Sequence, residues 1–309
     1  ATSNQGSTIQ NITANFSSNI TRPTSVEFIN SNGVNALLVG GLMTASNLAS
    51  PITVADSQSS GSLVNWRLFG SGLPNALVYQ MSYNSNADVL AISSIGRGLW
   101  AIYDVTSNFS QAQSLNFGKA NNVSNPDASI LTDGTNVDTG ASFVRGLNKY
   151  GTGLLSITGA ASYTGQTNIY DGNLFVGGGG SIANSSLTTV SSGAILSGNG
   201  IVGNVNVQDG GILAPGSSTS LGTLAIHGNL VLASDPATTA ISISGSTSSK
   251  ISVTGTASLG GYAVFNGTFP AAAYLPTNKY TFLSAAGGIS GQYSSCLLYT
   301  SPSPRDQRG

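Results

Sequence analysis

The sequence predicts an all-β protein, made of partial β-propeller blades followed by a right-handed parallel β-helix. Three observations support this prediction. Short runs of Val, Ile and Leu are separated by Gly, Asn and Asp, which is the pattern of strands and turns. Strong helix formers are scarce, and Glu27 is the only glutamate in the 309 residues. Finally, two sets of internal repeats with different periods divide the chain.

The composition excludes several classes of protein. Charged residues make up only 7% of the chain, against roughly 25% in an average soluble domain. No apolar run reaches the ~18 residues of a membrane-spanning helix, and 40% hydrophobic residues are too many for a disordered chain. The net charge of -1 leaves no basic face for nucleic acid, so no nucleic-acid partner is expected.

The first set of repeats lies in residues 1–105. The pattern of residues 9–16 recurs at 66–73, and that of 26–39 recurs at 81–92, at a spacing of about 50 residues. Within these repeats, short strands are expected at 25–29, 37–39, 52–55 and 65–69. Several strands per period of this length are typical of propeller blades. Residues 1–105 are therefore interpreted as the C-terminal blades of an incomplete β-propeller.

The second set of repeats lies in residues 149–295, and its template is a β-branched residue, a glycine three positions later and an aliphatic residue two after that. The three instances are Ile169/Gly172/Leu174, Val190/Gly193/Ile195 and Val207/Gly210/Ile212. They recur about every 20 residues, which is one turn of a parallel β-helix. Inward β-branched side chains would stack between rungs, and glycine permits a positive φ at each corner. The polar residues 106–148 are predicted to be a linker, with the start of the helix as the alternative.

The second region resembles the passenger-associated β-strand repeats of autotransporters. The similar segments are KYGTGLL at 149–155, YTGQT at 163–167, DGNL at 171–174, GGILAPG at 210–216 and VTGTA at 253–257. The resemblance implies a type V secretion passenger on the surface of a Gram-negative bacterium, or secreted from it. It also implies a partner, the C-terminal outer-membrane β-barrel translocator, which is missing from this sequence. A structural or adhesive role is the expectation, with host or environmental glycans or proteins as ligands.

Residues 1–105 resemble the blades of sialidase-type (BNR) propellers through GLPNA at 72–76, DVLAI at 88–92 and GRGLW at 96–100. Only a partial match to the Asp-box of that family is present, between Asp56 and Trp66, and its spacing is longer than in the family. An alternative function follows, a fragment of a secreted propeller hydrolase whose active site lies in missing N-terminal blades. Its candidate acids are Glu27, Asp56, Asp88 and Asp104, and its candidate arginines, expected in turns, are Arg22, Arg67 and Arg97.

Other patterns give no catalytic, cofactor or metal site, and the chain is not expected to be an enzyme. His227 is the only histidine and is expected on the solvent side of a strand, without the partners that a triad or metal centre needs. GNGIVG at 198–203 matches the dinucleotide pattern, but a strand is expected after it instead of a helix. A calcium ion shared by Asp127, Asp133 and Asp138 is weighed against a solvated loop, because their spacing fits no EF-hand.

The segment 296–309 differs abruptly from the rest of the chain. CLLYTSPSPRD is what a transposase adapter for sequencing libraries encodes when it is read in frame. Residues 296–309 are therefore interpreted as an adapter-derived artefact. Because Cys296 is the only cysteine, the remaining chain has none, and neither a disulfide nor a thiolate metal site is expected.

Overall fold

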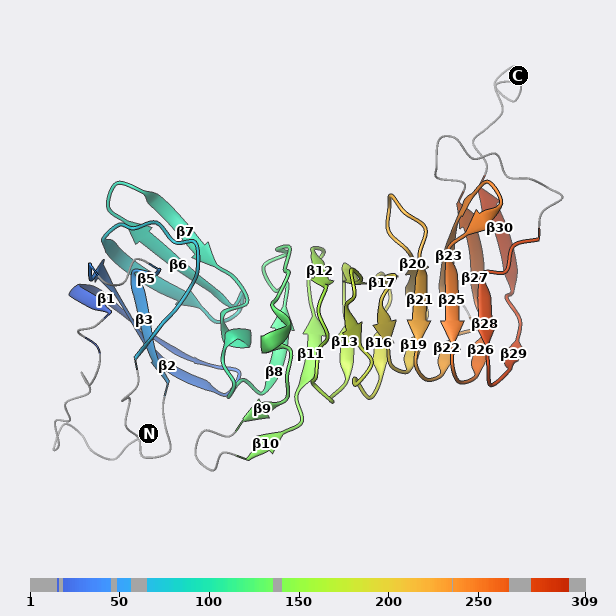
Figure 1. Ribbon diagram of the computed structural model, residues 1–309, viewed down its shortest axis with the longest axis horizontal. Coiled ribbons are helices and arrows are strands. Elements are labelled where there is room, and N and C mark those ends of the chain that lie inside the picture. The colour runs from blue at the N-terminus through green and yellow to red at the C-terminus, as the bar shows by residue number, and fades with distance from the viewer. Residues whose placement is uncertain are drawn as a thin grey trace, which may run out of the picture. The chain divides into compact units, whose positions relative to one another are not determined.

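The computed structural model is built from strands and short 3-10 turns (Figure 1). It describes residues 16, 19–45, 49–56, 66–135, 141–234, 236–266 and 279–299. Two compact units are present, residues 1–113 with 135–143, and residues 114–134 with 144–309. The predicted all-β class is confirmed. Within the described residues, no helix is long and apolar enough to span a membrane.

The first unit contains two antiparallel sheets, each with its strands in sequence order. The larger sheet consists of β1 (Ile20–Ser31), β2 (Val34–Met43), β3 (Ile52–Asp56) and β4 (Arg67–Leu68). The smaller sheet consists of β5 (Val78–Asn84), β6 (Val89–Ser94) and β7 (Gly98–Ile102), followed by the 3-10 turn η2 (Val105–Asn108). Asn32 and Gly33, at φ 53° and 77°, join β1 to β2 in the hairpin turn that this residue pair favours.

The two sheets of the first unit share one apolar core, which includes Leu38, Val54, Met81 and Leu90. The larger sheet is also apolar on its other face. There Val26 lies opposite Val39 and Phe28 opposite Leu37. Val26 and Phe28 are 61% and 52% exposed. Elsewhere on this face Val39, Ala55 and Trp66 form a second buried cluster, so the face is covered in part.

The second unit contains three parallel sheets that the chain visits in turn. The first sheet consists of β8 (Ser114–Phe117), β11 (Gly146–Lys149), β13 (Thr167–Ile169), β16 (Thr188–Val190), β19 (Val205–Val207), β22 (Leu230–Leu232), β26 (Ala257–Leu259) and β29 (Ile289–Gly291). The second consists of β12 (Leu154–Ile157), β14 (Asn173–Val176), β17 (Ile195–Gly198), β20 (Ile212–Pro215), β23 (Thr238–Ser244), β27 (Tyr262–Asn266) and β30 (Ser295–Tyr299). The third consists of β15 (Ser181–Ile182), β18 (Ile201–Val202), β21 (Thr223–Ile226), β25 (Lys250–Val253) and β28 (Leu283–Ala285). Because the chain passes from sheet to sheet and each strand pairs in register with its neighbours in the sheet, the chain forms a stack of coils (Figure 1). This arrangement confirms the predicted parallel β-helix.

Smaller elements complete the fold. A short antiparallel strand, β24 (Thr247–Ser248), pairs with the end of β23. A two-stranded sheet joins β9 (Gly134–Thr135) to β10 (Ser142–Phe143). The 3-10 turn η3 (Ala128–Ile130) lies before β9.

The inward ladder of the helix has the predicted register. Ile169 pairs with Val190, and Val190 pairs with Val207. All three side chains are completely buried. The predicted corner glycines Gly172, Gly193 and Gly210 have φ angles of 67°, 79° and 77°, which only glycine adopts readily.

The third position of the repeat template is shifted by one residue. The template aligned Leu174 with Ile195 and Ile212, but the sheet pairs Leu174 with Leu196, and Leu196 with Leu213. These three leucines are completely buried, whereas Ile195 and Ile212 are only half-buried on the outer face. A shift of one residue moves a strand side chain to the opposite face, so this part of the prediction was wrong.

The helix also includes part of the segment 106–148. Strands β8 and β11 pair in parallel, with Leu115 opposite Leu147, and β11 pairs in turn with β13. Ser124 bridges to Leu155 at the start of the second sheet. The first rungs of the helix therefore begin at Ser114, as the alternative for this segment expected.

A chain of buried hydroxyl groups lies inside an early coil. The Tyr163 hydroxyl is 2.7 Å from Thr167 Oγ1, which is 2.8 Å from Ser185 Oγ. Ser185 Oγ donates to the carbonyl oxygen of Gly165 at 3.0 Å. Burial raises the pKa of the Tyr163 phenol well above its ordinary value, because the charged phenolate would lose its solvation.

This burial predicts an alkaline loss of stability. The folded-state pKa of Tyr163 lies above the unfolded value of about 10, so its contribution is complete below about pH 10 and is lost as the pH rises further. Tyr163→Phe is expected to cost ~1 kcal/mol near neutral pH, because one hydrogen bond is lost. Its free energy of unfolding should then fall less than that of the wild type at alkaline pH. Urea unfolding at several pH values measures both, and an equal alkaline fall would contradict the prediction.

Candidate functional site

The sequence candidates for metal or triad chemistry have separate surroundings where the structure describes them. His227 follows β21 and is exposed as predicted, and its backbone N–H donates to the carbonyl oxygen of Val202 at 2.8 Å. The Asp127 carboxylate accepts the N–H of Ser129 at 2.9 Å, at the start of η3. Asp138 lies outside the described residues. Within the described ranges, no three His, Cys, Asp or Glu side chains gather where they could hold a metal ion.

Asp133 has a structural set of partners. Its carboxylate accepts the backbone N–H groups of Arg145 at 3.1 Å and Thr164 at 2.9 Å, and the Thr164 hydroxyl at 2.8 Å. Burial opposes ionisation, but these hydrogen bonds and the Arg145 charge hold the pKa of Asp133 below its ordinary value. Asp133 therefore fastens the loop before β11 to the loop before β13.

Two of the candidate acids of the first unit, Asp88 and Glu27, accept hydrogen bonds within the fold. Asp88 is buried and accepts the Thr106 N–H at 3.0 Å, the Thr106 hydroxyl at 2.8 Å and the Tyr83 hydroxyl at 2.8 Å. Glu27 Oε1 accepts the N–H of Tyr83 at 2.9 Å and so joins β1 to β5. Asp104 is buried directly before η2. The side chain of Asp56 lies outside the described residues.

The three candidate arginines lie in different elements. Arg97 is in the turn between β6 and β7, as predicted, and its carbonyl oxygen accepts the Trp100 indole N–H at 2.9 Å. Arg22 and Arg67 lie in strands β1 and β4, so the turn prediction was wrong for these two. The Arg67 guanidinium packs 5.2 Å from the ring centroid of Phe109.

The glycine motif at 198–203 is a corner of the helix. Strand β17 ends at Gly198 and strand β18 begins at Ile201, so a strand follows the motif as predicted. Gly198 has a φ of 126°, and a Cβ there would collide with the carbonyl oxygen of Val176 on the neighbouring rung. Close backbone packing explains this glycine, with no phosphate needed.

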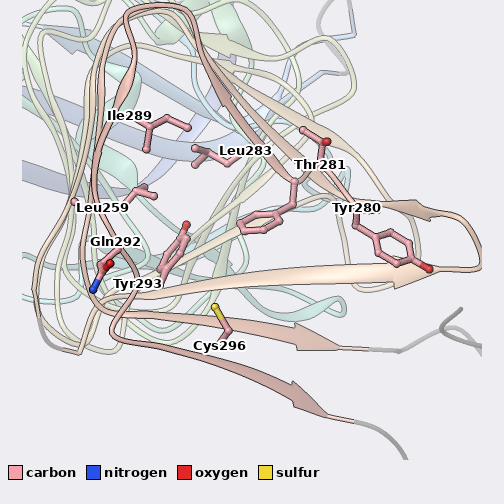
Figure 2. Close-up of a pocket in the computed structure, with 10 residues that line it drawn as sticks. Leu259, Tyr280, Thr281, Leu283, Ile289, Gln292, Tyr293 and Cys296 are labelled. Carbon is pink, nitrogen blue, oxygen red and sulfur yellow. The ribbon is translucent and has the colours of Figure 1, made fainter. Parts of the chain in front are cut away.

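One end of the second unit has an apolar pocket of about 500 Å³ (Figure 2). Leu259, Leu283 and Ile289 contribute to it, together with Tyr293 and Cys296. Ile289 pairs with the completely buried Ala257, yet Ile289 is 51% exposed. The pocket is therefore the uncovered interior of the last described coil. Its wall also includes Cys296, from the segment interpreted as adapter-derived.

A second hollow of about 590 Å³ is a groove on the outward face of the second sheet. Its floor consists of outward side chains from five successive strands, and its wall is the last residue of β20 and the loop that follows it. The floor residues are Leu154, Ser156, Asn173, Phe175, Ile195, Ser197, Ala214, Ala240 and Ser242, and the wall residues are Pro215, Gly216, Ser217 and Ser218. We refer to these thirteen residues as the sheet groove.

The wall of the sheet groove is held by its own hydrogen bonds. The Gly216 N–H donates to the carbonyl oxygen of Gly198 at 2.7 Å, which ties the loop to β17. Ser217 Oγ accepts the N–H of Ser220 at 3.0 Å and that of Thr219 at 3.3 Å. On the floor, the Ser197 hydroxyl donates to Asn173 Oδ1 at 2.8 Å. These hydrogen bonds fix the positions of the wall and of part of the floor.

Sequence reasoning did not find this groove, although its wall begins inside the segment GGILAPG. The groove offers hydroxyl, amide and apolar surface, which suits binding, and none of its residues is titratable. Fold and groove together define an all-β protein with N-terminal antiparallel sheets, a parallel β-helix and an uncharged, grooved outer face. No known family model and no curated protein matches the sequence.

Proposed function

We propose that this chain is a fragment of an autotransporter passenger, exposed on the cell surface or secreted, with a structural or adhesive role. The observation that supports it best is the ladder of Ile169, Val190 and Val207, because these residues lie in the repeats that carry the resemblance. Each coil packs only on its neighbours, so many coils can be stacked into a long array. Such an array would hold a binding surface away from the membrane.

The polarity of the faces supports adhesion. Most outward positions on the first sheet are amides and hydroxyls, with Val231 as an exposed apolar exception. Asn168 and Asn148 continue a column of side-chain hydrogen bonds to Asn116, at 3.1 and 3.0 Å. The sheet groove adds a concave surface with the same chemistry. An uncharged, hydrogen-bonding surface of this kind is suited to holding a ligand in place.

The proposal includes the partner and the location. The passenger would be followed by an outer-membrane β-barrel translocator and would face the exterior of a Gram-negative cell. The only cysteine is Cys296, so the rest of the chain would cross the periplasm without forming a disulfide.

Surface labelling tests this proposal. The chain with Cys296→Ser would be placed between a signal peptide and a translocator barrel, and one cysteine would be introduced at a time. Val231 is 45% exposed and Val190 is completely buried. On intact cells, Val231→Cys should react with a membrane-impermeant maleimide, whereas Val190→Cys should react only after urea unfolds the passenger. No reaction of Val231→Cys on intact cells that contain the protein would contradict display.

A glycan array tests the adhesive part of the proposal. The complete passenger, labelled with a fluorophore, would be applied to immobilised glycans. Specific retention on one glycan class supports adhesion. No retention on any glycan would instead favour a purely structural passenger.

A further inference from the structure

We propose that the sheet groove binds a neutral carbohydrate chain. This inference rests on the proposed adhesive function and names the ligand class and the surface that would hold it. Three observations lead to it, namely the charge of the groove, the pairing of its strands and the mixture of groups on its floor.

The charge of the groove selects an uncharged ligand. None of its thirteen residues is Asp, Glu, Lys, Arg or His. Nucleic acids and acidic polysaccharides are bound through Lys and Arg side chains that pair with phosphate or carboxylate groups. The groove offers no such group, so a polyanion would gain no ionic contact there. The ligand class that fits is neutral.

The strand pairing disfavours an extended peptide. Peptides commonly bind to a sheet by adding a strand to a free edge. Strand β14 is paired with β12 on one side and β17 on the other, and β17 is paired again with β20. The remaining edge of β12 bonds to Ser124, whose N–H donates to the carbonyl oxygen of Leu154 and whose carbonyl oxygen accepts the N–H of Ser156, both at 2.8 Å. The main-chain groups of β12, β14 and β17 on the groove floor are therefore already paired.

The floor fits the two kinds of surface on a sugar ring. A sugar has hydroxyl groups around its edge and C–H groups on its faces. In the register of the sheet, Phe175 lies between Ser156 and Ser197, so one aromatic ring has a hydroxyl-bearing residue on each side. Neighbouring rungs are about 4.8 Å apart, so a chain along the axis meets a polar or apolar group at each rung. The volume of about 590 Å³ is within the range of ordinary ligand sites.

Native gel electrophoresis of the full chain, in gels that contain one polysaccharide each, measures binding. The neutral probes are dextran, laminarin and a galactomannan, and the charged probes are heparin and polygalacturonate. We expect at least one neutral probe to slow the chain and neither charged probe to do so. Absence of retardation by every neutral probe, or retardation by the charged probes alone, would overturn the proposal.

Substitutions locate the binding surface. Ala240→Arg fills the groove from β23, and Phe175→Ala removes the ring from the floor. Each is expected to weaken binding of the retarding polysaccharide at least tenfold. Val231→Arg is the matched control, because Val231 faces outward from β22 of the same coil but belongs to the first sheet. This control is expected to bind as the wild type does.

Circular dichroism melting curves would show that the variants are folded. If Val231→Arg weakens binding as much as Ala240→Arg, the groove is not the site and the inference fails. Failure here is distinct from failure of the proposed function. Surface labelling of Val231→Cys without binding of any neutral probe would overturn the groove inference and leave display intact.

Discussion

Val190→Asp is expected to unfold the β-helix, with a loss of at least ~4 kcal/mol in the free energy of unfolding. The Val190 side chain is completely buried and lies between Ile169 and Val207 in the inward ladder. An aspartate there would bury a carboxyl group between Ile169 and Val207, whose aliphatic side chains supply no hydrogen-bond donor. The coils above and below would lose the surface against which they pack, because each rung depends on its neighbours.

Two spectroscopic signals separate this effect from changes in the first unit. Both tryptophans, Trp66 and Trp100, belong to the first unit. Urea unfolding of Val190→Asp should therefore lose β-structure by circular dichroism at low urea, while tryptophan fluorescence still reports a folded first unit. The adjacent residue Thr189 is half-buried on the outer face, so Thr189→Asp should stay within ~1 kcal/mol of the wild type. Equal tolerance of both substitutions would show that the ladder does not face inward at Val190.

The inward ladder was predictable from the sequence because its signal is redundant. A β-branched residue and a corner glycine recur together at Ile169, Val190 and Val207. The two signals independently indicate the same inward strand position. The second inward column was harder to predict. Ile195 and Leu196 are both aliphatic, so alternation alone does not tell which one faces the core. Pairing with Leu174 on the rung below decides it, and this is a contact between residues far apart in sequence.

The sheet groove was not predictable for a related reason. Its floor takes one or two outward side chains from each of five strands, and Ser156 and Ser242 come from opposite ends of that series. No short motif connects such residues. His227 and Asp127 attract attention because charged and titratable residues are scarce in this chain. That scarcity does not predict where such a residue lies in the fold. Only the loop after Pro215 gives a local signal, since proline followed by glycine ends a strand.

The buried position of Lys149 was the hardest to predict from the sequence. It occupies the same ladder column as Ile169, with which it pairs, and it is completely buried. Its Nζ donates to the carbonyl oxygens of Tyr150 at 2.7 Å, Gly151 at 2.6 Å and Asp171 at 3.1 Å. A buried ammonium group is costly unless such partners surround it. Here the corners of two successive coils provide them.

Lys149→Met is accordingly expected to destabilise the β-helix by ~3–5 kcal/mol. Methionine keeps a long unbranched side chain in the ladder but leaves three corner carbonyl oxygens without this donor. The same urea unfolding experiment measures the loss. Lys250→Met, at an exposed position in β25, removes the same charge and should change the free energy of unfolding by no more than ~0.5 kcal/mol.

Val190→Asp and Lys149→Met change the charge inside the same ladder in opposite ways. Val190→Asp adds a charge where no partner is provided, and Lys149→Met removes a charge where three partners are provided. If stability followed apolar burial alone, Lys149→Met would stabilise the helix, because methionine would bury an apolar side chain where lysine has to bury a charge. A stable Lys149→Met variant would thus show that the corner carbonyls find other donors. A large loss would show that Lys149 joins the first coils by binding their corners together.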